Sequence, residues 1–457
     1  MEKRSSFTGK IGFVLAAAGS AVGLGNIWRF PYLAAKYGGG IFLLVYLILA
    51  VTLGFALMCG EIALGRKTGQ SAIGAFSALN KKFSFVGVLA AIVPMMILPY
   101  YSVIGGWVTK YLAVFVSGQG KAAATTDYFT NFIAKPWEPL GWFLLFIGVT
   151  ALVVLMGVNK GIERVSKIMM PVLVVLTIGV AIYSMTLPGA MEGVKYYILP
   201  NFKALEWSKV PTLVLAAMGQ LFYSMSLAMG IMITYGSYMK KDVNLESSVK
   251  QIEWFDCGIA FLAGLMIIPA VYSFEGVEGM GKGPGLMFVT LPKVFDSFPG
   301  GHIVGAVFFL LVLFAALTSS ISLFETVVSV FKDKFGWNRN LICLFVFLGS
   351  VAVGTPCSLG HGVWSHISIK NAADSAMTIL DMFDFASNSV LMPIVALLTC
   401  IFIGYIIKPE SLIAEVEMSA KFKRKKMFAA IIKYVAPVCI VLILIFSVLE
   451  ALGVLSV

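Results

Sequence analysis

The chain is poor in charge. Asp, Glu, Lys and Arg make up 12% of its 457 residues, whereas hydrophobic residues make up 59%. This number of charged side chains is too small to cover the surface of a soluble protein of this length. The composition therefore excludes soluble multidomain proteins and indicates a polytopic membrane protein. The sequence also lacks a low-complexity tail and a separate polar domain, so functional charges must lie within or between membrane spans.

Histidine and paired cysteine are scarce. The three histidines fall in expected outer loops or at a span edge, at His302, His361 and His366, and no HExxH or Gly-x-Ser-x-Gly motif is present. An enzyme is therefore not expected. The six cysteines have no metal-ligand spacing, and only Cys357 is expected in an outer loop, so no disulfide framework is implied.

Acidic residues are fewer than basic ones. There are 34 Lys and Arg residues against 23 Asp and Glu residues, which gives a formal net charge of +11. The basic residues gather at the ends of apolar runs, as in "GRKTG" and "KFKRKKMF", and mostly on one side of the expected spans. This is the positive-inside signal, so it predicts a plasma-membrane protein with a cytoplasmic N-terminus and requires no nucleic acid as partner.

Long apolar runs are abundant, so we expect an all-α integral membrane protein with about eleven transmembrane helices. The runs lie at 11–36, 40–65, 84–114, 141–157, 165–187, 211–239, 253–273, 302–331, 340–356, 376–407 and 428–454. An odd number places the C-terminus outside, and the basic loop 408–427 then lies in the cytoplasm. The first run could imitate a signal peptide, but it continues into "VGLGNIWRFPY" without a cleavage site.

Two of these spans are interrupted. The first contains "LAAAGSAVGLGNIWRFPY", and the sixth contains "AAMGQLFYSMSLAMGIMITYGSY". Small residues that pack helices together would explain one such break. A matched pair five spans apart, with polar residues beside both, instead predicts an inverted five-plus-five helix repeat with a site near the midplane. We expect one transporter domain, 1–457, with repeats at 11–187 and 211–407 and an additional eleventh span at 428–454.

A helix opened inside a membrane exposes backbone groups that need partners. The amides of Gly23, Leu24 and Gly25 begin a half-helix, whose positive end favours a carboxylate. The carbonyls that precede Gly23 direct oxygen toward a cation. The break therefore predicts a combined anion and cation site made largely from backbone.

The stretch "AAAGSAVGLGNIWRFPY" resembles the first-span signature of the neurotransmitter:sodium symporter family. The likeness continues through "GGGIFLLVY", "PYYSVIGGW", "GQLFYSMSLAMG", "AALTSSISLFE" and "LDMFDF", in order and over nearly the whole chain. The resemblance implies a secondary active symporter that works by alternating access in the lipid bilayer. Its partners would be a small-molecule amino acid and two sodium ions, with no organic cofactor; the oligomeric state stays open.

By the same resemblance, two sodium sites adjoin the first break. Site one would use the substrate carboxylate with Ala21, Asn26, Ser224 and Asp256. Site two would use Gly19, Val22, Ala315, Thr318 and Ser319. The residues themselves agree, since "TSS" offers uncharged oxygen ligands, although such hydroxyls also bond back to their own helix.

Many animal members of the family need chloride beside site one. Here Asp256 falls where they have an amide, and the residues that would surround the anion correspond to Tyr46, Gln220 and Ser224. A carboxylate would balance the charge of the sodium ions, so the resemblance predicts transport without chloride. The alternative is an aspartate that is solvated near the cytoplasmic end of its span.

Arg29 lies inside a span, where an arginine needs a partner. The resemblance pairs Arg29 with Asp384 as an outer gate, with Gln220 nearby and Tyr101 and Tyr223 as a lid beneath; a permanent structural ion pair is the alternative.

The inner gate would pair Arg4 with Asp333, supported by Tyr238. Phe7 stands near the position of the family's usual tryptophan and would form an apolar plug. Gly161 and Pro171 match a helix-unwinding motif of the family, or a simple helix start followed by a kink.

Gly23 stands where monoamine-carrying relatives have an aspartate, so the substrate should bring its own carboxylate. Its ammonium group would meet the carbonyls of Ala21 and Tyr223 and the hydroxyl of Ser226. The expected lining is Ala21, Gly23, Leu24, Gly25, Ile97, Tyr101, Tyr223, Ser224, Ser226, Met229, Ser319 and Leu323. Its apolar part predicts neutral hydrophobic L-amino acids, and the methyl group of Ala228 favours aliphatic side chains and methionine over tryptophan.

A channel, or a transporter-like sensor that binds an amino acid but barely transports it, would carry many of the same residues. The sequence leaves these alternatives open.

Overall fold

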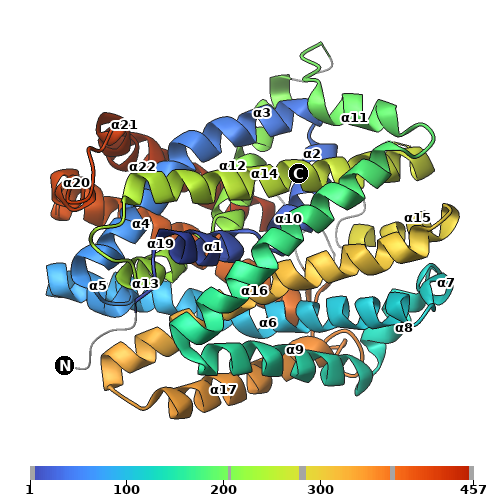
Figure 1. Cartoon of the computed structure of the whole chain (residues 1–457), viewed down its shortest axis with the longest axis horizontal. Helices are drawn as coiled ribbons and strands as arrows, with labels where there is room; N and C mark the ends of the chain where they lie inside the picture. The colour runs from blue at the N-terminus through green and yellow to red at the C-terminus, as the bar shows by residue number, and fades with distance from the viewer. Residues whose placement is uncertain (1–5, 204–206, 277–284, 371–375, 452–457) are drawn as a thin grey trace.

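The computed structural model describes residues 6–203, 207–276, 285–370 and 376–451. Helices make up almost all of this part of the chain (Figure 1). Its only strands are β1 (Ile369–Lys370) and β2 (Ala376–Met377), which pair antiparallel beside the tenth span. The all-α expectation is therefore confirmed.

In the first half of the chain, long helices alternate with short connecting ones. Several spans contain short π-helical or 3-10 segments, labelled η. The elements are α1 (Lys10–Ala21), η1 (Gly25–Arg29), α2 (Phe30–Lys36), α3 (Gly40–Leu49), η2 (Ala50–Gly54), α4 (Phe55–Thr68), α5 (Ala72–Leu79), η3 (Lys81–Phe83), α6 (Ser84–Val116), α7 (Gly120–Ala123), α8 (Tyr128–Ala134), α9 (Glu138–Leu155), η4 (Val158–Glu163), α10 (Arg164–Met185) and α11 (Ala190–Ile198).

The second half repeats this alternation and ends in the last two spans and the helix between them. The elements are η5 (Trp207–Lys209), α12 (Val210–Ser224), α13 (Ile231–Ser237), α14 (Leu245–Glu275), η7 (Leu286–Thr290), α15 (Leu291–Ser297), α16 (Gly301–Phe335), α17 (Arg339–Leu359), α18 (Ile379–Asp384), η8 (Phe385–Leu391), α19 (Met392–Ile401), η9 (Phe402–Ile406), α20 (Pro409–Glu417), α21 (Lys425–Ala430), η10 (Ile431–Val435) and α22 (Ala436–Ala451).

The spans follow the expected apolar runs. Within the described residues, nine helices are long and apolar enough to cross a membrane, and a tenth span is the pair Lys10–Ala21 and Gly25–Lys36, bent by 53° at its break. The remaining expected span, 211–239, consists of α12 and α13, which are separated by residues 225–230. Both predicted interruptions are therefore present in the structure.

One placement from the sequence is wrong. Cys357 does not lie in an outer loop but in the last turn of α17, where it is fully buried. The helix continues for three residues past Pro356, although proline there cannot donate a backbone hydrogen bond to the preceding turn. The connection after the seventh span contains η7 and α15, whereas residues 277–284 lie outside the described part.

The broken helices meet in the interior. Almost all residues of α1 are buried, and this helix packs against α10, α14 and α16. Helix α13 packs on α4, and α6 runs along α16 (Figure 1). The polar backbone of both breaks is thereby enclosed by long apolar helices, in a medium where unpaired groups would be costly.

Candidate functional site

The break in the first span is shaped by its own residues. Helix α1 ends at Ala21, and Val22 is extended, with φ −75° and ψ 96°. Gly23 then donates its N–H to Oδ1 of Asn26 at 3.2 Å, and Asn26 donates its N–H back to the Gly23 carbonyl at 3.2 Å. This reciprocal cap begins the second half-helix and fixes the side chain of Asn26 at the break.

The break in the sixth span is held by other helices. Ser226 and Ala228 have φ of 53° and 60°, a left-handed conformation that side chains other than glycine rarely adopt. Ser226 donates its hydroxyl to the carbonyl of Ser20 at 2.9 Å, and Ala228 donates its N–H to Oε1 of the buried Glu61 at 2.7 Å. These contacts with α1 and α4 compensate for the backbone strain.

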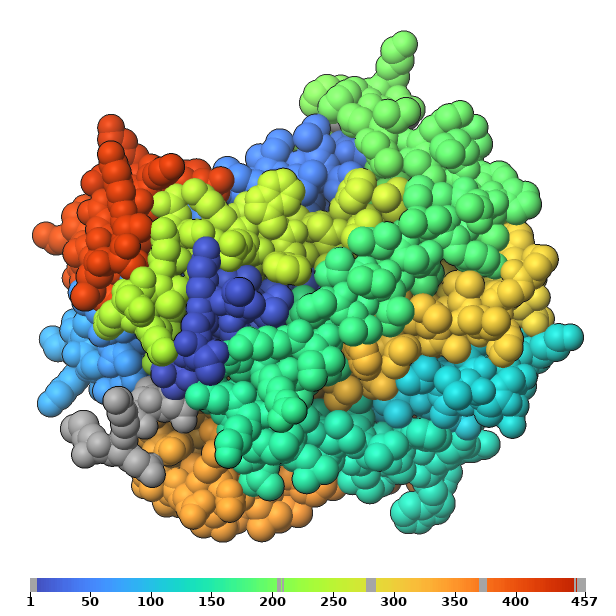
Figure 2. Space-filling model, viewed as in Figure 1, coloured from blue at the N-terminus to red at the C-terminus, as the bar shows by residue number. Residues whose placement is uncertain are grey.

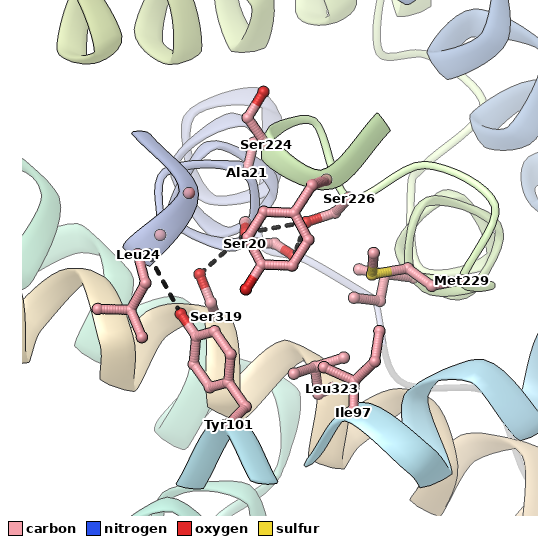
Figure 3. A pocket seen from close by; sticks show the side chains of 14 residues that line it. Ser20, Ala21, Leu24, Ile97, Tyr101, Ser224, Ser226, Met229, Ser319 and Leu323 are labelled. Carbon is pink, nitrogen blue, oxygen red and sulfur yellow. Dashed lines mark hydrogen bonds between the residues drawn. The ribbon is translucent and has the colours of Figure 1, made fainter. Parts of the chain in front are cut away.

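Between the two breaks lies a cavity of about 360 Å³, open space included (Figure 3). All twelve residues expected to contact the substrate line it, from α1, η1, α6, α12, α16 and the segment after α12. Two further lining residues, Ser20 and Ile231, were missed. Ser20 could have been found, because it stands between Gly19 and Ala21, and its hydroxyl lies 3.1 Å from that of Ser226.

One end of the cavity is polar and tightly closed. Leu24 donates its N–H to the hydroxyl of Tyr101 at 3.4 Å (Figure 3). A Cβ atom at Gly23 would lie 2.6 Å from Oγ of Ser319 and 3.1 Å from the Tyr101 hydroxyl, and one at Gly25 would lie 2.6 Å from the ring of Tyr223. Side chains are therefore excluded at both glycines, and their backbone stays accessible to a small ligand.

The other end is apolar. Ile97, Met229 and Leu323 lie side by side there, away from the hydroxyl groups (Figure 3). Met229 follows the strained Ala228 and closes the cavity from the sixth span. A molecule with one polar end and one apolar end would match the polar and apolar ends of this cavity.

The residues predicted for the second sodium site come together. Ser319 directs its hydroxyl at the carbonyl of Ser20 (3.0 Å), and it also lies within hydrogen-bond range of the carbonyls of Gly19 (3.4 Å) and Val22 (3.5 Å). Thr318 bonds the carbonyl of Ala315 at 3.1 Å, and its Cβ lies 3.2 Å from a Cβ built on Gly19. Every oxygen in this cluster is uncharged, which suits a dehydrated monovalent cation.

The residues predicted for the first site form a second cluster. Asp256 is fully buried and accepts hydrogen bonds from Nδ2 of Asn26 (2.7 Å) and from the hydroxyl of Tyr46 (2.9 Å). The Tyr46 hydroxyl also lies 2.7 Å from that of Ser224. The alternative of a solvated Asp256 is therefore wrong. Gln220 instead bonds the carbonyl of Gly25, at 2.8 Å.

The two outer-gate residues, Arg29 and Asp384, do not contact each other directly. The guanidinium of Arg29 lies 5.5 Å from the ring centre of Tyr223, and among the described residues no ion pair joins it to Asp384. Asp384 instead accepts hydrogen bonds from Tyr100 (3.0 Å) and Asn388 (2.6 Å). A permanent brace would require direct contact, which this conformation lacks. Asn388 follows Asp384 by one helical turn, a spacing that could have found it.

At the opposite end, Phe7 is a buried plug. Its ring packs edge-on against Phe13, Tyr235 and Tyr238, at 5.7 to 6.1 Å between centres. Tyr238 donates its hydroxyl to Glu325 at 2.7 Å.

Asp333 accepts the backbone N–H of Ser71 at 2.7 Å; its predicted partner Arg4 lies outside the described residues. The start of the fifth span is already non-α, because Gly161 falls within the π-helical η4, while Pro171 lies inside α10.

Comparisons with known proteins agree with this geometry. The family model described as the sodium:neurotransmitter symporter family matches residues 4–130 and 137–454. A Bacillus subtilis protein described as the uncharacterized sodium-dependent transporter YhdH is 37% identical, over 100% of this chain and 99% of its own. A Haemophilus influenzae uncharacterized sodium-dependent transporter is 32% identical, over 97% and 98%.

A solved structure is also similar. The crystal structure of MhsT in complex with L-phenylalanine superposes with a TM-score of 0.87 at 38% sequence identity, covering 97% of this chain and 100% of that one.

Proposed function

The chain belongs to the sodium:neurotransmitter symporter family, a family of membrane transporters, and on this premise we propose that it carries neutral hydrophobic L-amino acids into the cell together with sodium. The observation that carries the proposal is the single cavity between the two breaks, which has an open backbone and hydroxyl groups at one end and apolar side chains at the other.

The substrate would lie across this cavity. Its carboxylate would accept hydrogen bonds from the amides at residues 23–25 and from Tyr101, at the positive end of a half-helix. Its ammonium group would donate to the carbonyls of Ala21 and Tyr223 and to the hydroxyl of Ser226. The side chain would point toward Ile97, Met229 and Leu323. The absence of room at Gly23 supports an amino acid over a monoamine, because an aspartate there would collide with Ser319 and Tyr101.

Two sodium ions would be co-transported as substrates. One would bind beside Asp256, Asn26 and Ser224, and the other among the neutral oxygens around Thr318 and Ser319. The residues present fit such ions, because the two clusters together offer carboxylate, carbonyl, amide and hydroxyl oxygens. Asp256 supplies a fixed negative charge, which supports transport without chloride.

Alternating access would use the two ends of the molecule in turn. Arg29 and Asp384 would close over the substrate on the outside, while the Phe7 plug and the pair of Arg4 and Asp333 would close the cytoplasmic side. We propose the corresponding orientation, with the N-terminus in the cytoplasm and the two inverted repeats at 11–187 and 211–407. The resemblance of MhsT, whose crystal contains L-phenylalanine, supports a hydrophobic substrate.

The test is uptake into sealed proteoliposomes. Radiolabelled leucine, methionine, phenylalanine and tryptophan are supplied with sodium, potassium or choline outside. Accumulation above equilibrium only with inward sodium supports the proposal, and equal accumulation in all three salts contradicts it. Sodium-dependent binding in detergent without accumulation in vesicles would instead support the sensor.

A further inference from the structure

A second cavity lies where the tenth and eleventh spans end beside α20. It holds about 1040 Å³, open space included, and shares no lining residue with the cavity between the breaks. Its lining combines aromatic and charged side chains, among them Tyr405, Lys408, Glu410, Lys433 and Tyr434. Neither the comparisons nor the transport mechanism gives this cavity a role.

Two π-helical segments build its wall. Segment η9 of the tenth span packs against η10 of the eleventh. Tyr405 donates its hydroxyl to the carbonyl of Lys433 at 2.6 Å, and a Cβ atom built on Gly404 would lie 3.5 Å from Cγ of Lys433. That distance is an ordinary van der Waals contact, so the stem of Lys433 lies against the tenth span at the edge of the cavity.

Lys408 occupies the turn between the tenth span and α20. Its φ is +61°, a left-handed conformation that a glycine would adopt with less strain. Helix α20 begins at the next residue, and its first turn lines the cavity through Glu410 and Ser411. The positive end of that helix and two lysines thus face one space.

Both ammonium groups are available. Within the part of the chain that the structure describes, no hydrogen bond or ion pair engages the side chain of Lys408 or Lys433. With Glu410, the three side chains leave a net charge of +1. This is the charge that one phosphodiester would neutralise.

The surroundings are those of a membrane interface. Tyr405 and Tyr434 are 53% and 65% exposed, and Val435 and Val438, on the neighbouring turns of the eleventh span, are 49% and 61% exposed. Exposed tyrosines followed by exposed aliphatic side chains are typical of the boundary between headgroups and acyl chains. A ligand that enters here from the bilayer must therefore carry both a charged head and apolar tails.

We propose that this cavity binds an anionic phospholipid of the phosphatidylglycerol type from the cytoplasmic leaflet. Its phosphate lies between the ammonium groups of Lys408 and Lys433. Its glycerol hydroxyls donate to the carboxylate of Glu410, and its acyl chains follow the exposed apolar face of α22. Basic pockets between spans on the cytoplasmic side are suited to such headgroups.

The bound lipid would act on α20. Glu415 of this helix forms ion pairs with the buried Arg66 of α4 (2.9 Å) and with Lys241, just after α13 (2.8 Å). Figure 2 shows α20 and α21, in red, at one corner of the molecule. A lipid held at the first turn of α20 would therefore brace a helix that is tied to the inner half of the broken sixth span.

The test measures lipid retention by native mass spectrometry of the full-length protein. Delipidated protein is titrated with dioleoyl-phosphatidylglycerol or dioleoyl-phosphatidylcholine. The wild type should retain one phosphatidylglycerol more tightly than phosphatidylcholine, and Lys408→Gln with Lys433→Gln should weaken that retention by at least about tenfold. The matched control, Lys421→Gln with Lys426→Gln, changes the same charge on the same loop region outside the cavity and should leave it within about twofold.

If the two double variants lose phosphatidylglycerol retention equally, the lipid is attracted to positive charge in general, and the proposed site is wrong. Normal sodium-dependent amino acid binding in the same preparations shows that the variants are folded. A third variant, Glu410→Gln, keeps an acceptor for the glycerol hydroxyls and should retain phosphatidylglycerol. If the wild type instead holds dioleoyl-phosphatidylethanolamine as tightly, and Glu410→Gln loses it, the site selects an ammonium headgroup and the assignment is wrong.

Discussion

The two oxygen clusters beside the first break differ in charge. Around Asp256, a buried carboxylate gathers Asn26 and Tyr46. Around Ser319, every nearby oxygen belongs to a carbonyl or a hydroxyl. Both clusters border the opened backbone of the same span. On the proposed function, the break supplies a general attraction for cations, and the charge of Asp256 from the seventh span takes the place of an additional anion.

Removing the charge should have the largest effect. Asp256→Asn leaves sodium without a fixed counter-charge, so we expect sodium-driven uptake in gluconate to fall by roughly 100-fold, about 2.7 kcal/mol. Chloride should restore part of it. The measurement is the initial uptake rate in proteoliposomes with each anion, against the control Asp296→Asn, which removes an exposed carboxylate of α15. Normal uptake by Asp256→Asn in gluconate would show that the charge of Asp256 is not needed, and the two clusters would then not differ in this respect.

Removing ligands from the neutral cluster should have a smaller effect. Thr318→Ala with Ser319→Ala deletes two hydroxyls while the carbonyls of the break remain, so half-saturation by sodium should rise roughly 10-fold. Sodium titration of substrate binding measures this. Thr326→Ala removes a buried hydroxyl of the same helix that bonds only its own backbone, and it should leave the titration unchanged. An unaltered titration in the double variant would remove both hydroxyls from the site.

Removing the charge of the outer gate should have a smaller effect again, and it should fall on substrate affinity. Asp384→Asn removes the charge that attracts Arg29, so we expect substrate affinity to fall about fivefold while the melting temperature stays within roughly 2 °C. Asn388→Ala removes one hydrogen bond to Asp384 and one to Tyr100 but leaves the charge, so it should have a weaker effect in the same direction. Loss of stability with normal affinity in the surviving protein would show a structural brace instead.

Replacing chloride by gluconate should have the smallest effect of all on the wild type. Because the proposal assigns the balancing charge to Asp256, uptake should change by less than about 1.5-fold. The comparison is made at constant sodium and ionic strength. A wild-type requirement for chloride would show that the carboxylate does not take the place of the anion.

The local sequence predicted the spans and their interruptions, because the length and hydropathy of an apolar run and the glycines within it can be read from neighbouring residues. At the break after Ala21, the local cap is formed by Gly23 and Asn26, which hydrogen-bond each other. Local sequence did not predict the left-handed conformations at Ser226 and Ala228, because these are held by the distant partners Ser20 and Glu61. It also misplaced Cys357, since nothing near that residue marks the end of its helix.

The candidate site depended on more than local pattern. The resemblance of ordered motifs gave the lining residues, and the structure brings those residues into one cavity. Tyr100 and Asn388 were missed as partners of Asp384, because Tyr100 is distant in sequence and contributes only through its hydroxyl. The cavity proposed for a lipid was missed as well. Lys408, in the turn after the tenth span, and Lys433, in the eleventh span, come together only because the two spans pack.

The sequence by itself determined that the chain crosses the membrane many times and where two of its spans open. These properties follow from the free energies of burying apolar surface and of leaving backbone groups unpaired, and both are encoded residue by residue. Only the tertiary structure decided that Asp256 is buried beside Asn26 and Tyr46, that Arg29 and Asp384 are apart, and that Lys408 and Lys433 share a cavity. Those outcomes depend on how helices hundreds of residues apart pack together, which no local stretch specifies.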